Sequence, residues 1–119
     1  MIKSALPLFI AIIIITSCND EPTKTRNSFN VELTKNELFI YDTNHHGDEE
    51  GGRIVTQATN FLVSELSRDD STFQLLYRYQ PAEDYEGTDV VELELSSGSD
   101  GASPSTYLKY VTINFKISE

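Results

Sequence analysis

The side chains with the most chemical potential are grouped in one short segment, His45-His46-Gly47-Asp48-Glu49-Glu50. Imidazole and carboxylate groups together suit zinc, nickel or copper, whereas carboxylates alone suit calcium. Adjacent histidines on an extended chain point in opposite directions, so one ion rarely binds both without a sharp turn. The sequence has no second cysteine and no third histidine to complete a site. We therefore expect a solvated loop here and not a metal site.

Few residues in the sequence are placed to act in catalysis. A catalytic serine needs a general base and a third group that orients the base, and both histidines lie in the one polar segment. Paired carboxylates can act as acid and base, but one small core leaves little room for a cleft. The dipeptide Gly51-Gly52 lacks the lysine and the following helix of a phosphate-binding loop. The sequence predicts a protein that is not an enzyme and uses no cofactor.

The single cysteine, Cys18, ends an apolar N-terminal segment that has Lys3 near its start. This layout is typical of a secretory signal, and the apolar run from Ala5 to Ile15 is too short for a membrane span. Ile15-Thr16-Ser17-Cys18 resembles the lipobox of bacterial lipoproteins. The resemblance implies that residues 1–17 are a signal peptide and that Cys18 carries acyl chains. An ordinary signal peptide would instead leave an unpaired thiol in an oxidising compartment.

Removal of residues 1–17 leaves 102 residues, enough for one small domain. The removed segment contains Lys3 and no acid, so the net charge changes from −10 to −11. Such an acidic protein does not suit nucleic acid or an anionic lipid surface. Attachment to a membrane should therefore come from the acyl chains on Cys18 alone.

Residues 18–28 are predicted to form the lipidated cysteine and a flexible tether. The segment Asn19 to Ser28 is polar, contains Pro22 and has no apolar periodicity. Its acidic pair Asp20-Glu21 resembles sorting signals that place some Gram-negative lipoproteins on the cell surface. We expect a protein of the cell envelope, in the outer membrane or at the cell surface.

Residues 29–119 have the pattern of an all-β domain. Apolar and polar residues alternate over 29–33, and residues 38–41 form a second apolar run. Residues 42–52 read as a loop, and we interpret the ambiguous stretch 53–66 as two short strands. Three clearer amphipathic strands follow, with predicted inward residues Phe73, Leu75, Tyr77 and Tyr79, then Val91, Leu93 and Leu95, then Val111, Ile113, Phe115 and Ile117.

Those three strands in succession predict an antiparallel sheet with one buried face. About seven short strands in some hundred residues fit an immunoglobulin-like antiparallel β-sandwich. Pro81 should end its strand, and the Asp89 carboxylate should accept hydrogen bonds from turn amides. Tyr85 should pack its ring under the turn and bond its hydroxyl to nearby backbone, as corner tyrosines do in sandwiches.

A tyrosine-x-proline, followed by an aromatic-x-glycine-threonine-aspartate turn and a strand, occupies Tyr79, Pro81, Tyr85, Gly87, Thr88 and Asp89. Residues 79–117 thereby resemble bacterial cadherin-like and immunoglobulin-like repeats, and residues 29–78 match them poorly. The resemblance implies a scaffold for adhesion, spacing or ligand display. Such repeats usually occur in tandem, whereas this sequence contains one. It also suggests weak calcium candidates, Asp84, Glu86, Asp89 and Asp100, although the linker motifs that build those sites are not visible.

Three tyrosines, Tyr41, Tyr107 and Tyr110, are candidates for an exposed aromatic contact surface, with core or edge positions as the alternative. The sequence predicts a lipid-anchored, non-catalytic binding, adhesion or structural module whose protein or glycan partner is unknown. The alternative is an accessory or inhibitor protein whose loop 42–52 engages a soluble enzyme.

Overall fold

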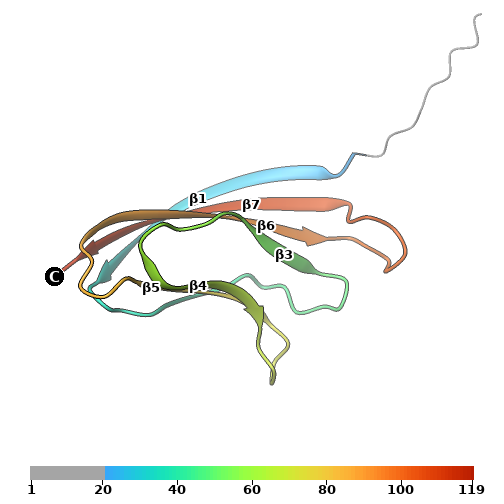
Figure 1. Cartoon of the computed structure of the whole chain (residues 1–119). Coiled ribbons are helices and arrows are strands. Elements are labelled where there is room, and N and C mark those ends of the chain that lie inside the picture. Colours follow the sequence, from blue (N-terminus) through green and yellow to red (C-terminus); the bar gives the residue numbers. More distant parts are fainter. Residues whose placement is uncertain (1–20) are drawn as a thin grey trace, which may run out of the picture.

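The computed structural model describes residues 21–119, which contain strands and no helix (Figure 1). The all-β prediction is therefore confirmed. Segments 1–17 and Cys18, predicted to be signal peptide and acylation site, lie outside the described residues. The seven strands are β1 (Thr23–Thr34), β2 (Phe39–Asp42), β3 (Gly51–Thr56), β4 (Phe61–Arg68), β5 (Leu75–Pro81), β6 (Gly87–Ser97) and β7 (Tyr107–Ser118).

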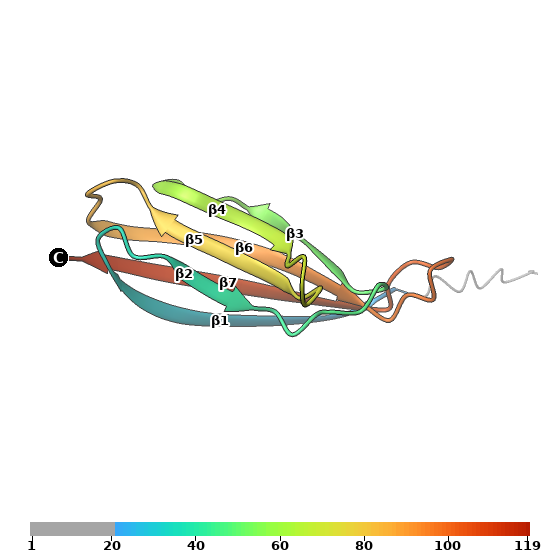
Figure 2. The same ribbon diagram turned by 90° about the horizontal axis from the view of Figure 1, so that it is seen from below.

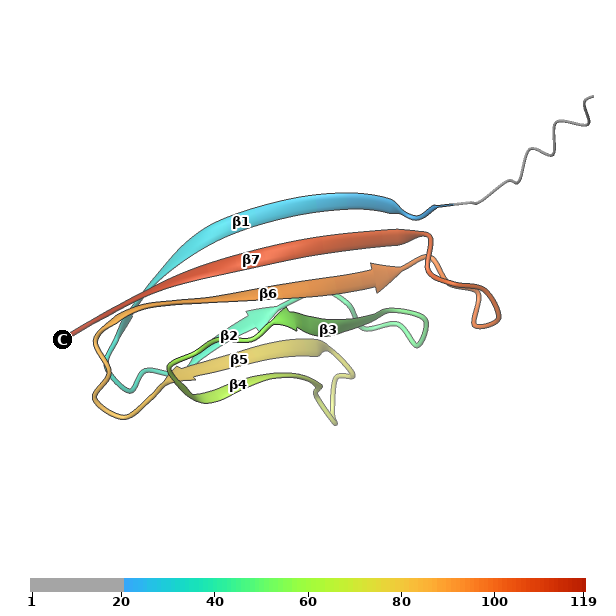
Figure 3. The same cartoon turned by 45° about the horizontal axis from the view of Figure 1, so that its top comes forward.

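The strands form two sheets that face each other as a sandwich (Figures 1 and 3). The four-stranded sheet has the order β1-β7-β6-β3, and the three-stranded sheet has the order β2-β5-β4. Most neighbours are antiparallel, as predicted. However, β1 and β7 run parallel, with Thr23 opposite Tyr107 and Thr34 opposite Ser118. Sequence periodicity did not predict this pairing, because it joins the two ends of the domain.

The prediction that the three C-terminal strands form one sheet is wrong for the first of them. Strands β6 and β7 are an antiparallel pair, but β5 pairs with β2 and β4 in the other sheet. The connection 82–86 carries the chain from one layer to the other. A period of two tells which face of a strand is buried, and it does not tell which strand lies beside it.

Some boundaries also differ from the predicted ones. Strand β1 begins at Thr23, so residues 23–28 belong to the sheet and not to a flexible tether. Their side chains are exposed on both faces, which explains why the sequence has no apolar period there. Gly51-Gly52 lies in β3 and not in the preceding loop. Phe73 lies before β5, in a turn with a positive φ of 61°, and is 45 % exposed.

The core lies between the two sheets and contains the predicted inward faces of β5, β6 and β7. Tyr79 from β5 stacks on Phe115 from β7, with ring centroids 3.9 Å apart. Phe29 from β1 packs against Tyr41 from β2, with ring centroids 5.4 Å apart. The buried apolar residues are Leu33, Ala58, Leu75, Tyr77, Tyr79, Val91, Leu93, Leu95, Val111, Ile113, Phe115 and Ile117.

Connections gather at two ends of the sandwich (Figure 2). Residues 35–38, 57–60 and 82–86 lie at the end where β7 finishes, which we call the C-terminal end. Residues 43–50, 69–74 and 98–106 lie at the opposite end, where β1 begins, which we call the N-terminal end. This arrangement follows from the alternating direction of successive strands.

The predicted corner tyrosine is confirmed at the C-terminal end. The Tyr85 hydroxyl donates a 2.7 Å hydrogen bond to the Thr88 carbonyl, and the ring packs against the core. Gly87 has a φ of 142°, and a Cβ there would lie 2.7 Å from the Tyr85 hydroxyl oxygen. The turn therefore needs glycine both for its backbone conformation and for space. Pro81 ends β5, as predicted.

Candidate functional site

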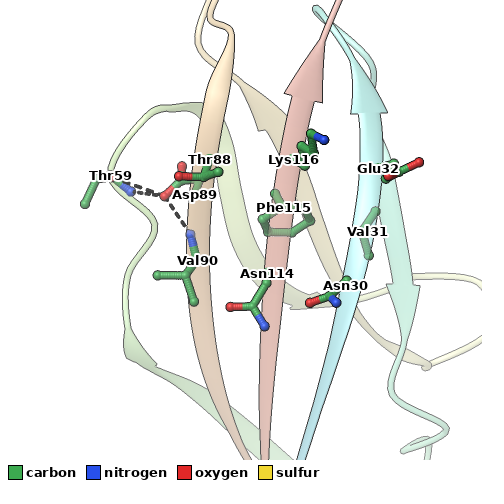
Figure 4. Close-up of a pocket in the computed structure, with 10 residues that line it drawn as sticks. All are labelled: Asn30, Val31, Glu32, Thr59, Thr88, Asp89, Val90, Asn114, Phe115 and Lys116. Atoms are coloured by element: carbon green, nitrogen blue, oxygen red, sulfur yellow. Dashed lines mark hydrogen bonds between the residues drawn. The ribbon is translucent and has the colours of Figure 1, made fainter.

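The outer face of the four-stranded sheet carries a hollow of about 610 Å³ near the C-terminal end (Figure 4). One cross-strand row of the hollow consists of Asn30 on β1, Asn114 on β7 and Val90 on β6, which are direct register partners. Val90 is 41 % exposed although its side chain is apolar. The Asn114 amide donates to the Ser28 hydroxyl at 3.1 Å, which fixes one amide beside the hollow.

A second row of the hollow consists of Glu32, Lys116 and Thr88, again on three neighbouring strands. All three residues are exposed. The two rows together present amide, carboxylate, ammonium and hydroxyl groups around an isopropyl group. Such a set can donate and accept hydrogen bonds with a polar ligand while the valine contacts a carbon face.

The buried carboxylate of Asp89 lies at the β6 edge of the hollow, beside Thr59 (Figure 4). It accepts hydrogen bonds from the backbone N–H groups of Thr59 and Asn60, each at 2.9 Å, and from the Tyr79 hydroxyl at 2.9 Å. The prediction that Asp89 accepts from turn amides is thus met by a different turn, the β3–β4 connection. One carboxylate on β6 of the four-stranded sheet thus binds β5 of the three-stranded sheet and the β3–β4 connection, which links the two sheets.

The protonation of Asp89 follows from these contacts. Burial alone would raise the pKa of this carboxyl group, but the hydrogen bonds from Thr59, Asn60, Tyr79 and Val90 outweigh it and hold the pKa below its usual value. Burial, followed by the bond to Asp89, raises the pKa of the Tyr79 hydroxyl. Asp89 is therefore an ionised structural group whose oxygens are occupied, and it is not placed as a catalytic base.

A third row continues the outer face toward the N-terminal end. The Arg26 guanidinium lies 4.4 Å from the centroid of the Tyr110 ring, and the Tyr110 hydroxyl donates to Glu94 at 2.8 Å. Arg53 donates to the same carboxylate at 3.0 Å. The bond from Arg53, then that from Tyr110, lowers the pKa of Glu94. These contacts order the side chains on a surface that faces solvent.

The three candidate contact tyrosines have different positions. Tyr110 lies under Arg26 in the row just described, and Tyr41 packs against Phe29 beside the core. Tyr107 at the start of β7 is 58 % exposed. The structure does not bring the three rings together, so they form no common aromatic surface.

The four weak calcium candidates are also dispersed. Asp84 accepts a 3.4 Å hydrogen bond from Asn36, and Glu86 lies 3.2 Å from the Lys35 ammonium, both at the C-terminal end. Asp100 accepts from backbone amides of its own loop at the N-terminal end. Asp89 is buried. Within residues 21–119, no group of three or more His, Cys, Asp or Glu side chains is close enough to hold a metal ion.

The histidine segment is better ordered than its composition suggested. The His45 carbonyl accepts from the Leu75 N–H at 2.7 Å, and the Thr43 hydroxyl donates to the Leu75 carbonyl at 2.8 Å. The His45 ring nitrogen Nδ1 lies 3.0 Å from the Thr43 carbonyl oxygen and 3.8 Å from Glu50. The loop is therefore fixed against the start of β5.

Sequence reasoning singled out Thr88 and Asp89 as turn residues, but it did not identify the polar residues of β1 and β7 that complete the hollow. Asn30, Glu32, Asn114 and Lys116 are the outward members of strands whose inward members were predicted, so alternation already placed them on a solvated face. What brings them together is the parallel pairing of β1 with β7. No local signal in the sequence indicates that pairing.

No protein-family model matches the sequence, and no curated protein matches it significantly. Among solved structures, the chain is similar to the crystal structure of a cysteine protease inhibitor from Entamoeba histolytica. The TM-score is 0.44 and the sequence identity 14 %, over 80 % of this chain and 95 % of that chain. A similarity of this size carries no argument about function. In the described part of the chain, no helix has the length and apolar character needed to span a membrane.

Proposed function

We propose that the protein is a lipid-anchored module of the cell envelope that binds a partner without catalysing a reaction. The observation that carries this proposal is the hollow on the outer sheet face, where two rows of polar side chains surround Val90 on a rigid framework. The hydrogen-bonding groups of that hollow suit a glycan or a polar peptide segment. The acyl acceptor would be Cys18, as its lipobox-like context indicates.

The length of the chain before β1 supports a defined orientation. Thr23 lies five positions after Cys18, and an extended chain spans at most about 18 Å over five positions. An acylated Cys18 would therefore hold the N-terminal end of the sandwich close to the membrane. The hollow, which lies toward the C-terminal end, would remain accessible from the other side.

The binding proposal is tested with a protein of residues 18–119, coupled to a surface through Cys18. Its core residues all lie between Leu33 and Ile117, so the fold does not depend on the removed segment. We expect it to retain soluble envelope polysaccharide or peptidoglycan fragments, and the double variant Asn30→Ala, Asn114→Ala to retain at least about tenfold less. Glu65→Ala on exposed β4 is the matched control. Equal retention by all three proteins would contradict the assignment of the hollow.

A second candidate function is inhibition or assistance of a soluble enzyme through loop 42–52. One observation favours it: this loop is tied to the neighbouring turn 69–74, which presents Phe73. The Arg68 guanidinium lies 4.6 Å from the Phe73 ring centroid and donates to the backbone carbonyls of Phe73 and Glu50. A half-exposed aromatic ring on an ordered turn is a typical anchor for a protein contact.

The two candidates predict different contact surfaces, at opposite ends of the sandwich. An enzyme partner should lose affinity for Phe73→Ala and keep its affinity for Asn30→Ala, Asn114→Ala. The membrane would also obstruct an end-on partner at the N-terminal end when Cys18 is acylated. Binding that is equal for soluble and membrane-anchored protein would therefore favour the outer-face hollow.

A further inference from the structure

The two sheets end in four edge strands, namely β1 and β3 of one sheet and β2 and β4 of the other. An edge strand presents unpaired N–H and C=O groups that can pair with another chain. Natural proteins protect such edges by keeping them short, by interrupting them with bulges or by placing charged side chains on them. Short length or a bulge protects three of the four edges.

The edge that is neither short nor bulged is β1, and its charged side chains are its one protective device. Strand β2 has four residues, and β3 and β4 each carry a register shift, at Ile54/Thr56 and at Phe61/Val63. Strand β1 has twelve residues, pairs with β7 in unbroken register and contains no proline. Its start extends past the ends of β4 and β5 (Figure 3), and no other described strand is hydrogen-bonded to its free edge.

The charges of β1 divide along its length. Lys24 and Arg26 lie on the outer face in the first half, and Glu32 lies on the same face in the second half. Arg26 is 71 % exposed, although it stacks on Tyr110 and lies 3.6 Å from Glu92. A guanidinium has five N–H donors, so this side chain can bind a further carboxylate.

We propose that β1 pairs with β1 of a second copy of this chain, in antiparallel orientation and centred on Phe29. Residues whose numbers add to 58 then face each other, so Arg26 of each copy lies opposite Glu32 of the other. Both outer faces remain on the same side, which gives one continuous eight-stranded sheet with two-fold symmetry. Strand pairs with opposite charges directly across are stabilised, and like charges are destabilised.

The single free edge of β1 disfavours a parallel pair. A parallel pair through that edge would turn one copy over about its strand axis, so the outer face of one copy would continue the inner face of the other, and Arg26 and Glu32 of the two copies would lie on opposite faces. A parallel arrangement with shifted register would also leave strand ends unpaired and would not close. The antiparallel pair is also compatible with the acidic protein as a whole, because β1 is one of its few segments with more basic than acidic residues.

Antiparallel pairing has a consequence for anchored copies, and this consequence rests on the proposed lipid anchor. The two Thr23 residues would lie at opposite ends of the paired strands, roughly 40 Å apart. Because each anchor begins five residues before its strand, the two copies can be attached to opposed membranes. The pair would then act as a homophilic adhesion contact.

The pairing itself is tested in solution, with residues 19–119 so that neither lipid nor Cys18 takes part. Sedimentation velocity over a dilution series should show a monomer–dimer equilibrium for the native sequence. Glu32→Arg places arginine opposite arginine twice per dimer and should weaken association at least about tenfold. Glu83→Arg, an equal charge change at an exposed site in the β5–β6 connection, should not weaken it. A monomer at every concentration, or equal effects of the two substitutions, would overturn the proposal.

Restoration by charge exchange tests the register. The double variant Arg26→Glu, Glu32→Arg again places opposite charges across the pair and should recover most of the lost association. Thermal unfolding of each variant shows whether loss of the Arg26–Tyr110 stack has harmed the fold. If the double variant is folded but remains a monomer, the Phe29-centred register is wrong.

The bridging step is tested with residues 18–119 coupled through Cys18 to maleimide-bearing vesicles of neutral phospholipid. Vesicles carrying the native sequence should aggregate, as measured by light scattering, and those carrying Glu32→Arg should not. Absence of aggregation by a protein that dimerises in solution would contradict the opposed-membrane arrangement. This result would leave the acylation of Cys18 in cells to be judged by lipid labelling, so the two proposals fail separately.

Discussion

Asp89 shows how one side chain can hold the two sheets in register. Its carboxylate receives donors from β5 and from the β3–β4 connection while its backbone belongs to β6. When a buried donor loses its acceptor, its desolvation costs free energy that no other contact in the interior compensates. The residue that the sequence presented as part of a turn is therefore a central structural group.

We expect Asp89→Asn to lower the free energy of unfolding by about 2–3 kcal/mol, because an amide NH₂ cannot accept from the Thr59, Asn60 and Tyr79 donors. Urea unfolding followed by circular dichroism measures the change. Asp70→Asn, in an exposed turn, is the control and should change stability little. Equal stability of the two variants would show that the Asp89 contacts contribute nothing.

The lowered pKa of Asp89 also predicts a pH dependence. The folded state favours the ionised carboxylate, so this contribution is complete above the unfolded-state pKa of about 3.9. The stabilisation from Asp89 is lost as the pH falls from the unfolded-state pKa through the lower folded-state pKa. The thermal midpoint of the native protein should therefore decrease more steeply below about pH 4 than that of Asp89→Asn. Parallel curves would contradict the proposed ionisation.

Phe115 and Thr112 lie on opposite faces of β7. Phe115 is 2 % exposed and stacks on Tyr79, so Phe115→Ala should cost about 3–5 kcal/mol of unfolding free energy. Thr112→Ala, on the outer face, should cost far less. Chemical denaturation of both variants compares them directly, and similar losses would mean that the strand faces are assigned wrongly.

At the scale of elements, the sequence predicted individual strands better than it predicted which strands pair. The inward residues of β6 and β7 follow a strict period of two, and burial on one face makes that period visible in the sequence. The first half of β1 carries no such period, because polar side chains leave both of its faces exposed. The parallel β1–β7 pair depends on where the chain returns after six strands, which no local pattern records.

In the candidate site too, the sequence predicted the exposure of single residues better than it predicted which residues lie together. The sequence drew attention to histidines and acids because those residue types bind metals, and the structure disperses the acids to opposite ends. The hollow instead consists of ordinary outward residues, such as Asn30 and Asn114, that become neighbours through tertiary pairing. Its residues could be placed on a solvated face from the sequence, but they could not be grouped.

The loops predict little response to metal ions. Asp84 and Glu86 each contact a residue of the β1–β2 connection, and Asp100 binds amides of its own loop. We expect the thermal midpoint of residues 19–119 to change little when calcium or zinc replaces a chelator. An increase of several degrees with calcium that Asp89→Ala abolishes and His45→Ala does not would instead establish a cadherin-like site.

At the scale of the whole molecule, we propose that an acidic sandwich is anchored at one end and exposes its outer sheet face. Net charge does not attract this protein to anionic lipid, so the proposed place in the envelope would depend on acylation. Cys18 is the only thiol in the sequence, and its proposed acylation would decide both the orientation of the domain and which surfaces a partner can reach.

Metabolic labelling with radioactive palmitate tests this central claim most directly. Cells that express the full chain should yield a labelled protein whose size corresponds to residues 18–119, and Cys18→Ser should yield an uncleaved and unlabelled precursor. Cys18 lies outside the described sandwich, so the substitution leaves the core intact. Normal cleavage of the Cys18→Ser variant, or a mature native protein without label, would contradict the lipid anchor.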